Sequence, residues 1–102
     1  MGQYVKVATV DEIAIGQAKV VEVSGQRIAI FNVNGTFYAI DDTCPHRGGP
    51  LSEGFTENEE VTCPWHGARF RLTTGEVLSP PATRGVQVFA VRVQGNDVEV
   101  EV

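Results

Sequence analysis

Cysteine, histidine and basic residues are all scarce in this chain of 102 residues. It contains only two cysteines and two histidines, and its eight lysines and arginines are outnumbered by thirteen aspartates and glutamates. The formal net charge is therefore −5. Because phosphate binding needs a basic surface, this balance argues against nucleic acid as a partner. An acidic surface instead suits docking on a basic patch of another protein.

Long apolar runs are also missing. No stretch is long enough to cross a bilayer, and residues 1–20 carry charged side chains in place of the apolar segment of a secretory signal. We therefore expect a cytoplasmic protein with no membrane partner. In a chain without a signal peptide, metal binding or redox chemistry explains two cysteines better than a disulfide does. The length leaves room for one domain, which we expect to span residues 1–102 and to be monomeric.

Leucine is rare, whereas valine is abundant: the chain has three leucines and sixteen valines. β-Branched residues favour strands and lose side-chain freedom in helices, and the eleven glycines and five prolines supply turns. The composition therefore predicts an all-β fold. The expected strands span residues 3–9, 17–23, 27–33, 36–40, 61–63, 69–72, 76–78, 86–93 and 98–102.

Local signals mark several of the connections. Asn34-Gly35 matches a two-residue hairpin loop, in which both central positions need a positive φ. Thr9 and Glu12 have the spacing of a capping box, which predicts a short helical turn. Residues 41–60, in contrast, show little periodicity and are rich in glycine, proline and charge. An irregular stretch of that length inside a small domain is usually functional.

Both cysteines and both histidines fall into two short, similar segments. One reads Cys44-Pro45-His46 and the other reads Cys63-Pro64-Trp65-His66. Each supplies one sulfur and one imidazole from a loop that follows an expected strand. No cysteine or histidine of the sequence is left over, so a scatter of ordinary core and surface residues explains the pattern poorly. The four side chains together predict a metal site.

The ligand types narrow the metal to zinc, copper or an iron–sulfur cluster. Two cysteines and two histidines could hold tetrahedral zinc, which would make the chain a zinc-stabilised interaction module. Zinc fingers, however, usually group cysteine with cysteine and histidine with histidine. One of each per loop suits a dinuclear cluster in which one iron takes two thiolates and the other takes two imidazoles. Because imidazole is neutral, such a cluster accepts an electron more easily than one with four thiolates.

The two motifs resemble those of Rieske [2Fe–2S] proteins. Together with the run CPWHGARF at residues 63–70, TG at 74–75 and PP at 80–81, they resemble the Rieske-type ferredoxins of bacterial aromatic-ring oxygenases. The resemblance implies one [2Fe–2S] cluster, whose ligands would be Cys44 and Cys63 on the inner iron and His46 and His66 on the outer iron. It also implies a β-sandwich base of antiparallel strands that carries a small cluster-binding subdomain, with cluster loops at about residues 43–50 and 63–70.

The same resemblance implies which neighbours shape the cluster site or a docking surface. These are Arg47, Gly48, Gly49, Trp65, Gly67, Pro80 and Pro81. The glycines would let backbone amides approach the sulfides closely, because they carry no side chain. The prolines belong to a loop at about residues 79–82 that would cover the cluster from a third side. Trp65 would either shield the cluster or anchor a partner, since tryptophan is common in interface hot spots.

This chain departs in two ways from the Rieske proteins of cytochrome bc complexes. Those proteins carry an extra cysteine in each loop, and the resulting disulfide ties the loops together, whereas this chain has no cysteine to spare. They also place serine and tyrosine hydroxyls near the cluster, where Ala68 and Phe70 stand here. Hydrogen bonds to sulfur stabilise the reduced form, so their loss predicts a potential near the low end of the Rieske range, at about −150 mV.

The function implied by the resemblance is one-electron transfer, from a flavin-containing ferredoxin reductase to a terminal oxygenase of the aromatic-ring-hydroxylating type, in aromatic hydrocarbon catabolism. The chain would not itself be an enzyme, because an oxygenase site needs two further histidines and none remains. The small subunit of an assimilatory nitrite reductase, which shares the fold, is the alternative. Six acidic residues flank the cluster loops in the sequence and would either steer docking or simply be solvated. They are Asp41, Asp42, Glu53, Glu57, Glu59 and Glu60.

Overall fold

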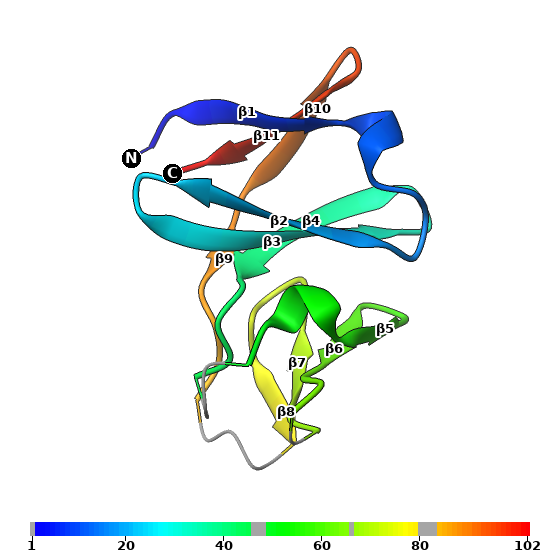
Figure 1. Ribbon diagram of the computed structural model, residues 1–102, viewed down its shortest axis with the longest axis vertical. Coiled ribbons are helices and arrows are strands. Elements are labelled where there is room, and N and C mark those ends of the chain that lie inside the picture. The colour runs from blue at the N-terminus through cyan, green and yellow to red at the C-terminus, as the bar shows by residue number, and fades with distance from the viewer. Residues whose placement is uncertain (1, 46–48, 66, 80–83) are drawn as a thin grey trace.

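The computed structural model describes residues 2–45, 49–65, 67–79 and 84–102, and this part of the chain is mostly antiparallel β-structure (Figure 1). Two sheets form a base. The first has the order β1 (Tyr4–Thr9), β11 (Asp97–Glu101), β10 (Val91–Gln94), and the second has the order β2 (Ala18–Val23), β3 (Gln26–Val33), β4 (Thr36–Asp41), β9 (Val88–Phe89). A third sheet, β5 (Phe55–Glu57), β6 (Glu60–Thr62), β7 (Arg69–Arg71), β8 (Val77–Ser79), forms a small subdomain at the other end of the molecule.

The local signals in the sequence produce the expected connections. Asn34 and Gly35 have φ values of 54° and 92°, so the hairpin between β3 and β4 closes with two left-handed residues, as predicted. The predicted helical turn is the short 3-10 helix η1 (Val10–Glu12). Its start is capped by the Glu12 carboxylate, which accepts a hydrogen bond from the Thr9 N–H at 2.7 Å.

Strand β3 separates two hydrophobic cores and belongs to both. Ile28 and Ile30 lie in the core between the two sheets of the base. Ala29 and Phe31 point the other way, into a second core that is shared with the small subdomain. Because successive side chains of a strand face opposite sides, one run of four apolar residues serves both cores. The first sheet of the base and the small subdomain are therefore packed on opposite faces of the second sheet.

The prediction of an irregular segment over residues 41–60 is partly wrong. This segment contains the 3-10 helix η2 (Leu51–Glu53) and the strand β5, which pairs with β6 in the register Thr56↔Val61. A three-residue strand is too short to show the alternation by which strands are recognised. The third sheet consequently has one more strand than the sequence indicates.

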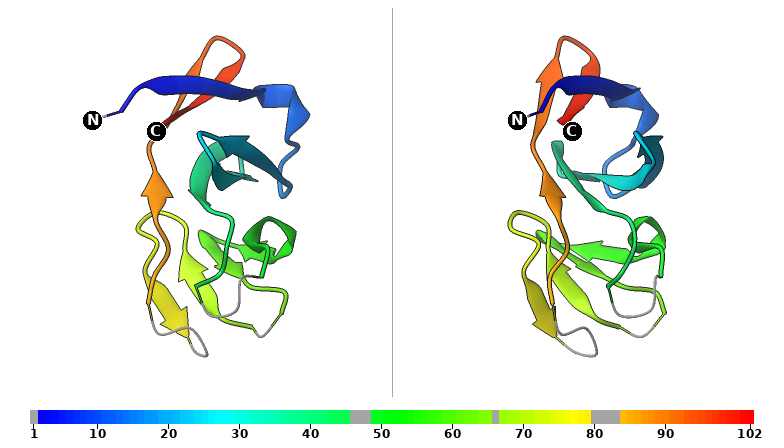
Figure 2. Two further views of the ribbon diagram at one scale, coloured as in Figure 1. Left: turned by 60° about the vertical axis from the view of Figure 1, so that its left-hand side comes forward. Right: turned by 90° about the vertical axis from the view of Figure 1, so that its left-hand side faces the viewer.

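The predicted strand at residues 86–93 is divided in two. β9 pairs with β4 in the second sheet, whereas β10 pairs with β11 in the first, and Ala90 separates them. Figure 2 shows this segment running along one side of the molecule, from the small subdomain to the base. A strand that changes sheets has to end its pairing in one sheet before it pairs in the next. The alternation of apolar residues continues through this break, so the sequence pattern does not reveal it.

Asp42 connects the base to the small subdomain and is buried, so the expectation that it is one of the solvated acids is wrong. Its side chain is only 2% exposed. One carboxylate oxygen accepts a hydrogen bond from the Ser52 N–H at 2.7 Å, and the other lies 3.5 Å from the Arg27 guanidinium. The Asp42 carbonyl also accepts a hydrogen bond from the Leu51 N–H. One residue thus joins β3 and η2 at the point where the chain leaves β4.

Replacing Asp42 by alanine should destabilise the protein by about 1–3 kcal/mol, because the partly buried Ser52 N–H would lose its acceptor. Asp42→Asn keeps an acceptor oxygen at the same place and should lose less. Urea unfolding, followed by circular dichroism, would measure both changes as shifts of the midpoint. A midpoint for Asp42→Ala equal to that of the wild type would show that this connection contributes nothing.

Candidate metal centre

Each cysteine begins a loop, and the two loops are closed in the same way. Cys44 comes shortly after β4, and its N–H donates to the Gly49 carbonyl at 2.9 Å. Cys63 directly follows β6, and its N–H donates to the Ala68 carbonyl at 2.7 Å. Both bonds join a cysteine to the residue five positions later. Two segments that resemble each other in sequence therefore also share their backbone closure.

Antiparallel pairing supports the base of each loop. An isolated bridge joins Thr43 to Pro50 below the first loop, and the β6–β7 pair places Thr62 opposite Arg69 below the second. Hydrogen bonds of this kind fix where the loop begins and ends. The cysteines consequently stand at the same position in both loops, immediately above the last paired residues.

The two sulfur-bearing residues lie in one buried core. Cys44 is 2% exposed and Cys63 is 4% exposed, and both belong to the core between β3 and the small subdomain. Neither of these cysteines, both of which the structure describes, forms a disulfide. Buried cysteines often serve only as small apolar residues. Two of them on separate, matching loops that meet in one core have the arrangement that the predicted thiolate ligands require.

A glycine lets the two loops come together. A Cβ on Gly49 would lie 2.9 Å from the Sγ atom of Cys63, a separation that real Cβ atoms essentially never show. Since Gly49 belongs to the first loop and Cys63 to the second, this close approach shows that the loops converge at the sulfur. Two soft sulfur donors on converging loops fit the thiolate half of a [2Fe–2S] site.

Several predicted site residues lie outside the described residues. These are His46, Arg47, Gly48, His66, Pro80 and Pro81. The structure describes Gly49, Trp65 and Gly67 among the predicted neighbours. Gly67 has a φ of +80°, the left-handed conformation that favours glycine, and nothing lies within 4 Å of where its Cβ would be. Glycine is therefore needed at position 67 for the shape of the backbone, whereas at position 49 it is needed for space.

No hydroxyl group stands at the two positions where bc-type proteins have one. Ala68 and Phe70 are 1% and 0% exposed, and both lie in the same core as Cys44 and Cys63. Apolar side chains donate no hydrogen bond to sulfur. The surroundings of the two cysteines are thus consistent with the low potential that the sequence predicts.

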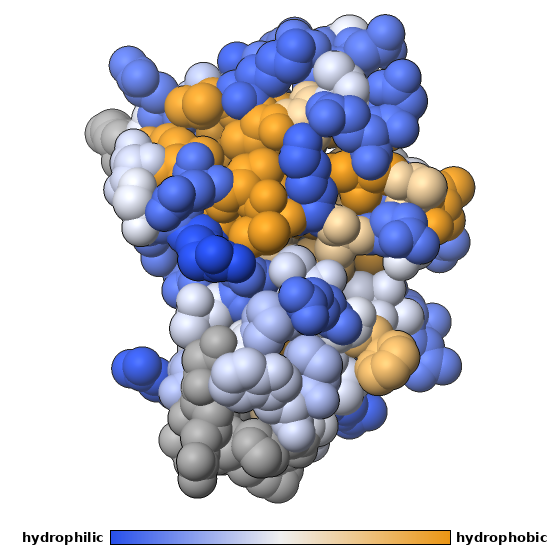
Figure 3. Space-filling model, in the orientation of Figure 1, coloured by the Kyte–Doolittle hydropathy of each residue, from blue (hydrophilic) through white to orange (hydrophobic). Residues whose placement is uncertain are grey.

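The acidic residues around the loops are distributed unevenly. Glu53, Glu57 and Glu59 are exposed on the small subdomain, whereas Glu60 is half-buried and lies 3.5 Å from the Arg69 guanidinium. Figure 3 shows that, in this view, apolar side chains gather over the base while the small subdomain is mainly polar or neutral. The exposed glutamates remain available for docking, and Asp42 does not.

Tyr38 provides a second polar connection between the base and the small subdomain. Its hydroxyl donates a hydrogen bond to the Glu59 carboxylate at 3.1 Å. Burial raises the pKa of Tyr38 above its ordinary value, and the neighbouring Glu59 carboxylate raises it further because a second negative charge is disfavoured there. The stability gained from neutral Tyr38 is therefore present below about pH 10 and is lost as the pH rises through the raised pKa.

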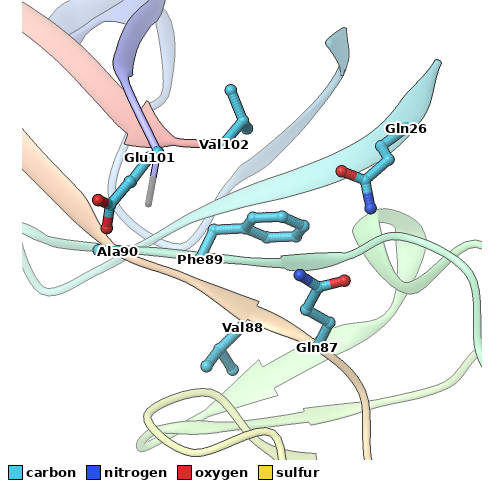
Figure 4. Close-up of a pocket in the computed structure, with 8 residues that line it drawn as sticks. Gln26, Gln87, Val88, Phe89, Ala90, Glu101 and Val102 are labelled. Carbon is cyan, nitrogen blue, oxygen red and sulfur yellow. The ribbon is translucent and has the colours of Figure 1, made fainter. Parts of the chain in front are cut away.

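A hollow of about 280 Å³ lies on the base, where the Phe89 ring points between the side chains of Gln26 and Gln87 (Figure 4). Its one carboxylate, Glu101, has no histidine or cysteine beside it among the lining residues. This hollow belongs to the base and shares no residue with the cysteine loops.

Two features near this centre were not predicted from the sequence. The first is the buried Asp42, whose partners, Arg27 and the Ser52 N–H, lie fifteen and ten residues away along the chain. The second is the contact of Gly49 with Cys63, because its closeness depends on how two distant loops meet. No local signal in the sequence reports a contact of that kind.

Comparisons with known proteins agree with this geometry. The family model described as the Rieske [2Fe-2S] domain matches residues 3–90. The biphenyl dioxygenase ferredoxin subunit of Pseudomonas sp. (strain KKS102) is 39% identical over 99 residues, which cover 96% of this chain and 91% of that protein.

No helix in the described part of the chain is long and apolar enough to span a membrane.

Solved structures show the same fold. A structure titled as a complex of reduced oxygenase and oxidized ferredoxin in carbazole 1,9a-dioxygenase matches with a TM-score of 0.90 and 34% identity, over 96% of this chain and 92% of that one. A protein described as a putative nitrite reductase small subunit from Mycobacterium tuberculosis also matches with a TM-score of 0.90, over 100% and 96% of the two chains. Its identity is 22%, so it shows the fold alone. On the family match and the curated relative, this chain belongs to the Rieske [2Fe–2S] domain family.

Proposed function

We propose that this chain is the ferredoxin component of an aromatic-ring dioxygenase system and carries single electrons to a terminal oxygenase. The observation that carries the proposal is the pair of matching loops, which bring Cys44 and Cys63 into one buried core. The similarity to the biphenyl dioxygenase ferredoxin subunit, over 96% of this chain, supports the same function.

The proposed ligands are Cys44 and Cys63 on one iron and His46 and His66 on the other. When bound, a cluster with this ligand set accepts and returns one electron. Both cysteines lie in an apolar core, where the buried side chains of Ala68 and Phe70 would keep water from the thiolates. The same proposal keeps Arg47, Gly48 and the prolines 80–81 as neighbours of the cluster. It also keeps residues 1–102 as a single domain.

The proposed acceptor is a terminal oxygenase, and the proposed donor is a flavin-containing ferredoxin reductase. Support for the acceptor comes from the matched complex of oxygenase and ferredoxin. The sequence has no glycine-rich dinucleotide motif, so its electrons must come from another protein. We further propose that the chain is a cytoplasmic monomer that docks through its exposed glutamates on a basic surface of its partner.

Anaerobic stopped-flow absorbance tests this function. NADH with a reductase of the biphenyl dioxygenase type should bleach the visible bands of the purified chain, whereas NADH alone should not. Adding an oxidised terminal oxygenase of that type should then restore the bands. A reduced chain that stays bleached with the oxygenase, and regains its bands with an assimilatory nitrite reductase, would favour the nitrite reductase subunit.

A further inference from the structure

The indole ring of Trp65 lies close to Gly49 of the first cluster loop. A Cβ on Gly49 would be 3.1 Å from two carbons of this ring, Cγ and Cδ2, as well as 2.9 Å from the Sγ atom of Cys63. Trp65 and Cys63 belong to the second loop, and Gly49 belongs to the first. One point on the first loop therefore contacts both a proposed ligand and a large aromatic side chain of the second.

The contact depends on the absence of a side chain at position 49. Gly49 is not among the described residues with a positive φ, so its backbone suits any amino acid. It is buried, and the added Cβ would meet the sulfur and the ring together. Glycine at this position thus keeps space for the ring and the sulfur, unlike Gly67, which is needed for its backbone conformation.

Trp65 is half-exposed, with 54% of its surface open to solvent. One part of the ring packs on the Gly49 backbone, while the rest faces outward. Aromatic rings bury a large area per residue and make favourable contacts with sulfur. The chain has only two cysteines, so no disulfide can join the loops once both sulfurs bind iron.

We propose that Trp65 and Gly49 form a non-covalent clamp, which holds the two cluster loops together and keeps water away from the sulfur of Cys63. Trp65 and Gly49 would be positioning residues, acting through Cys63. The clamp rests on the proposed role of Cys63 as an iron ligand. Water that reached the sulfur would donate hydrogen bonds to it and stabilise the reduced form. Opening the clamp should therefore both speed the loss of the cluster and raise its potential.

The test compares four variants of the holoprotein: Trp65→Ala, Trp65→Phe, Gly49→Ala and the control Phe55→Ala. Phe55 is also an exposed aromatic residue of the small subdomain, at 76%, but it lies on β5. The rate of cluster loss is measured from the fading of the visible bands in urea, and the potential from a redox titration. Trp65→Ala should lose its cluster several-fold faster and shift to a more positive potential. Trp65→Phe should be close to the wild type in both the rate of cluster loss and the potential. Phe55→Ala should match the wild type.

Gly49→Ala should act like Trp65→Ala, because the added methyl group would push the ring away from the loop. If the two residues act as one clamp, the double variant should be little worse than either single one, since coupled residues are not additive. Unchanged cluster loss and potential in Trp65→Ala would overturn the clamp. If Trp65→Ala only slows electron transfer to the oxygenase, the clamp is likewise overturned, because that result would assign Trp65 to docking. A wild-type chain that holds zinc would instead refute the proposed function.

Discussion

Replacing Cys63 by alanine should give a colourless protein without the visible bands or the EPR signal of a [2Fe–2S] cluster. Cys63 is buried at the start of the second loop, and its sulfur lies close to Gly49 of the first loop. Alanine supplies no donor, and no third cysteine exists in the chain to replace the lost thiolate. Cys44→Ala should have the same effect, because the proposed ligand set uses both sulfurs. The iron and sulfide contents of the purified variants measure this loss, which we expect to be complete.

A matched control separates ligand loss from a general disturbance of the loop. Thr62 precedes Cys63 and is half-buried in β6, and Thr62→Ser keeps the strand and both sulfurs. This variant should retain its cluster. His66→Ala and His46→Ala should lose the cluster or change its EPR spectrum, since they remove the proposed ligands of the other iron. A full cluster in either cysteine variant, or an unchanged spectrum in either histidine variant, would contradict the assigned ligands.

Adding two hydroxyl groups beside the cluster should raise its potential substantially. We expect the wild type to titrate at about −150 mV, because Ala68 and Phe70 donate no hydrogen bond to sulfur. In the double variant Ala68→Ser, Phe70→Tyr, hydroxyls would enter the same buried core as the two cysteines. Hydrogen bonds from them would favour the reduced form, whose charge is more negative. The expected rise is at least about 59 mV, a tenfold change in the equilibrium for one electron.

The control for this titration is Phe89→Tyr. Phe89 is a buried phenylalanine like Phe70, but it lies in the other core, between the two sheets of the base. The same added hydroxyl at this place should leave the potential unchanged. Equal shifts in the two variants would mean that a general loss of packing, and no local hydrogen bond, moves the potential. A clearly positive potential in the wild type would refute the expected low value.

Local patterns were sufficient to predict most of the base. The β-branched alternation and the Asn34-Gly35 turn predict the strands and the hairpin that the structure shows. Such signals work because each depends on a few neighbouring residues, through side-chain alternation or a positive φ. The paired Cys and His motifs likewise predict two loops that meet, and the structure brings Cys44 and Cys63 into one core.

Features that depend on distant contacts could not be predicted in this way. β5 is too short to show alternation, and its existence depends on pairing with β6. The break between β9 and β10 at Ala90 arises because the two strands join different sheets. The burial of Asp42 depends on Arg27 and on the Ser52 N–H, which lie fifteen and ten residues away. In each case the decisive partner lies outside the local pattern.

The most direct test of the central claim is EPR spectroscopy of the purified chain, combined with metal analysis. A Rieske [2Fe–2S] carrier should be red-brown when oxidised, contain two irons and two sulfides per chain, and give a Rieske-type EPR signal after reduction with dithionite. A colourless protein that contains one zinc per chain, purified without exposure to air, would contradict the account.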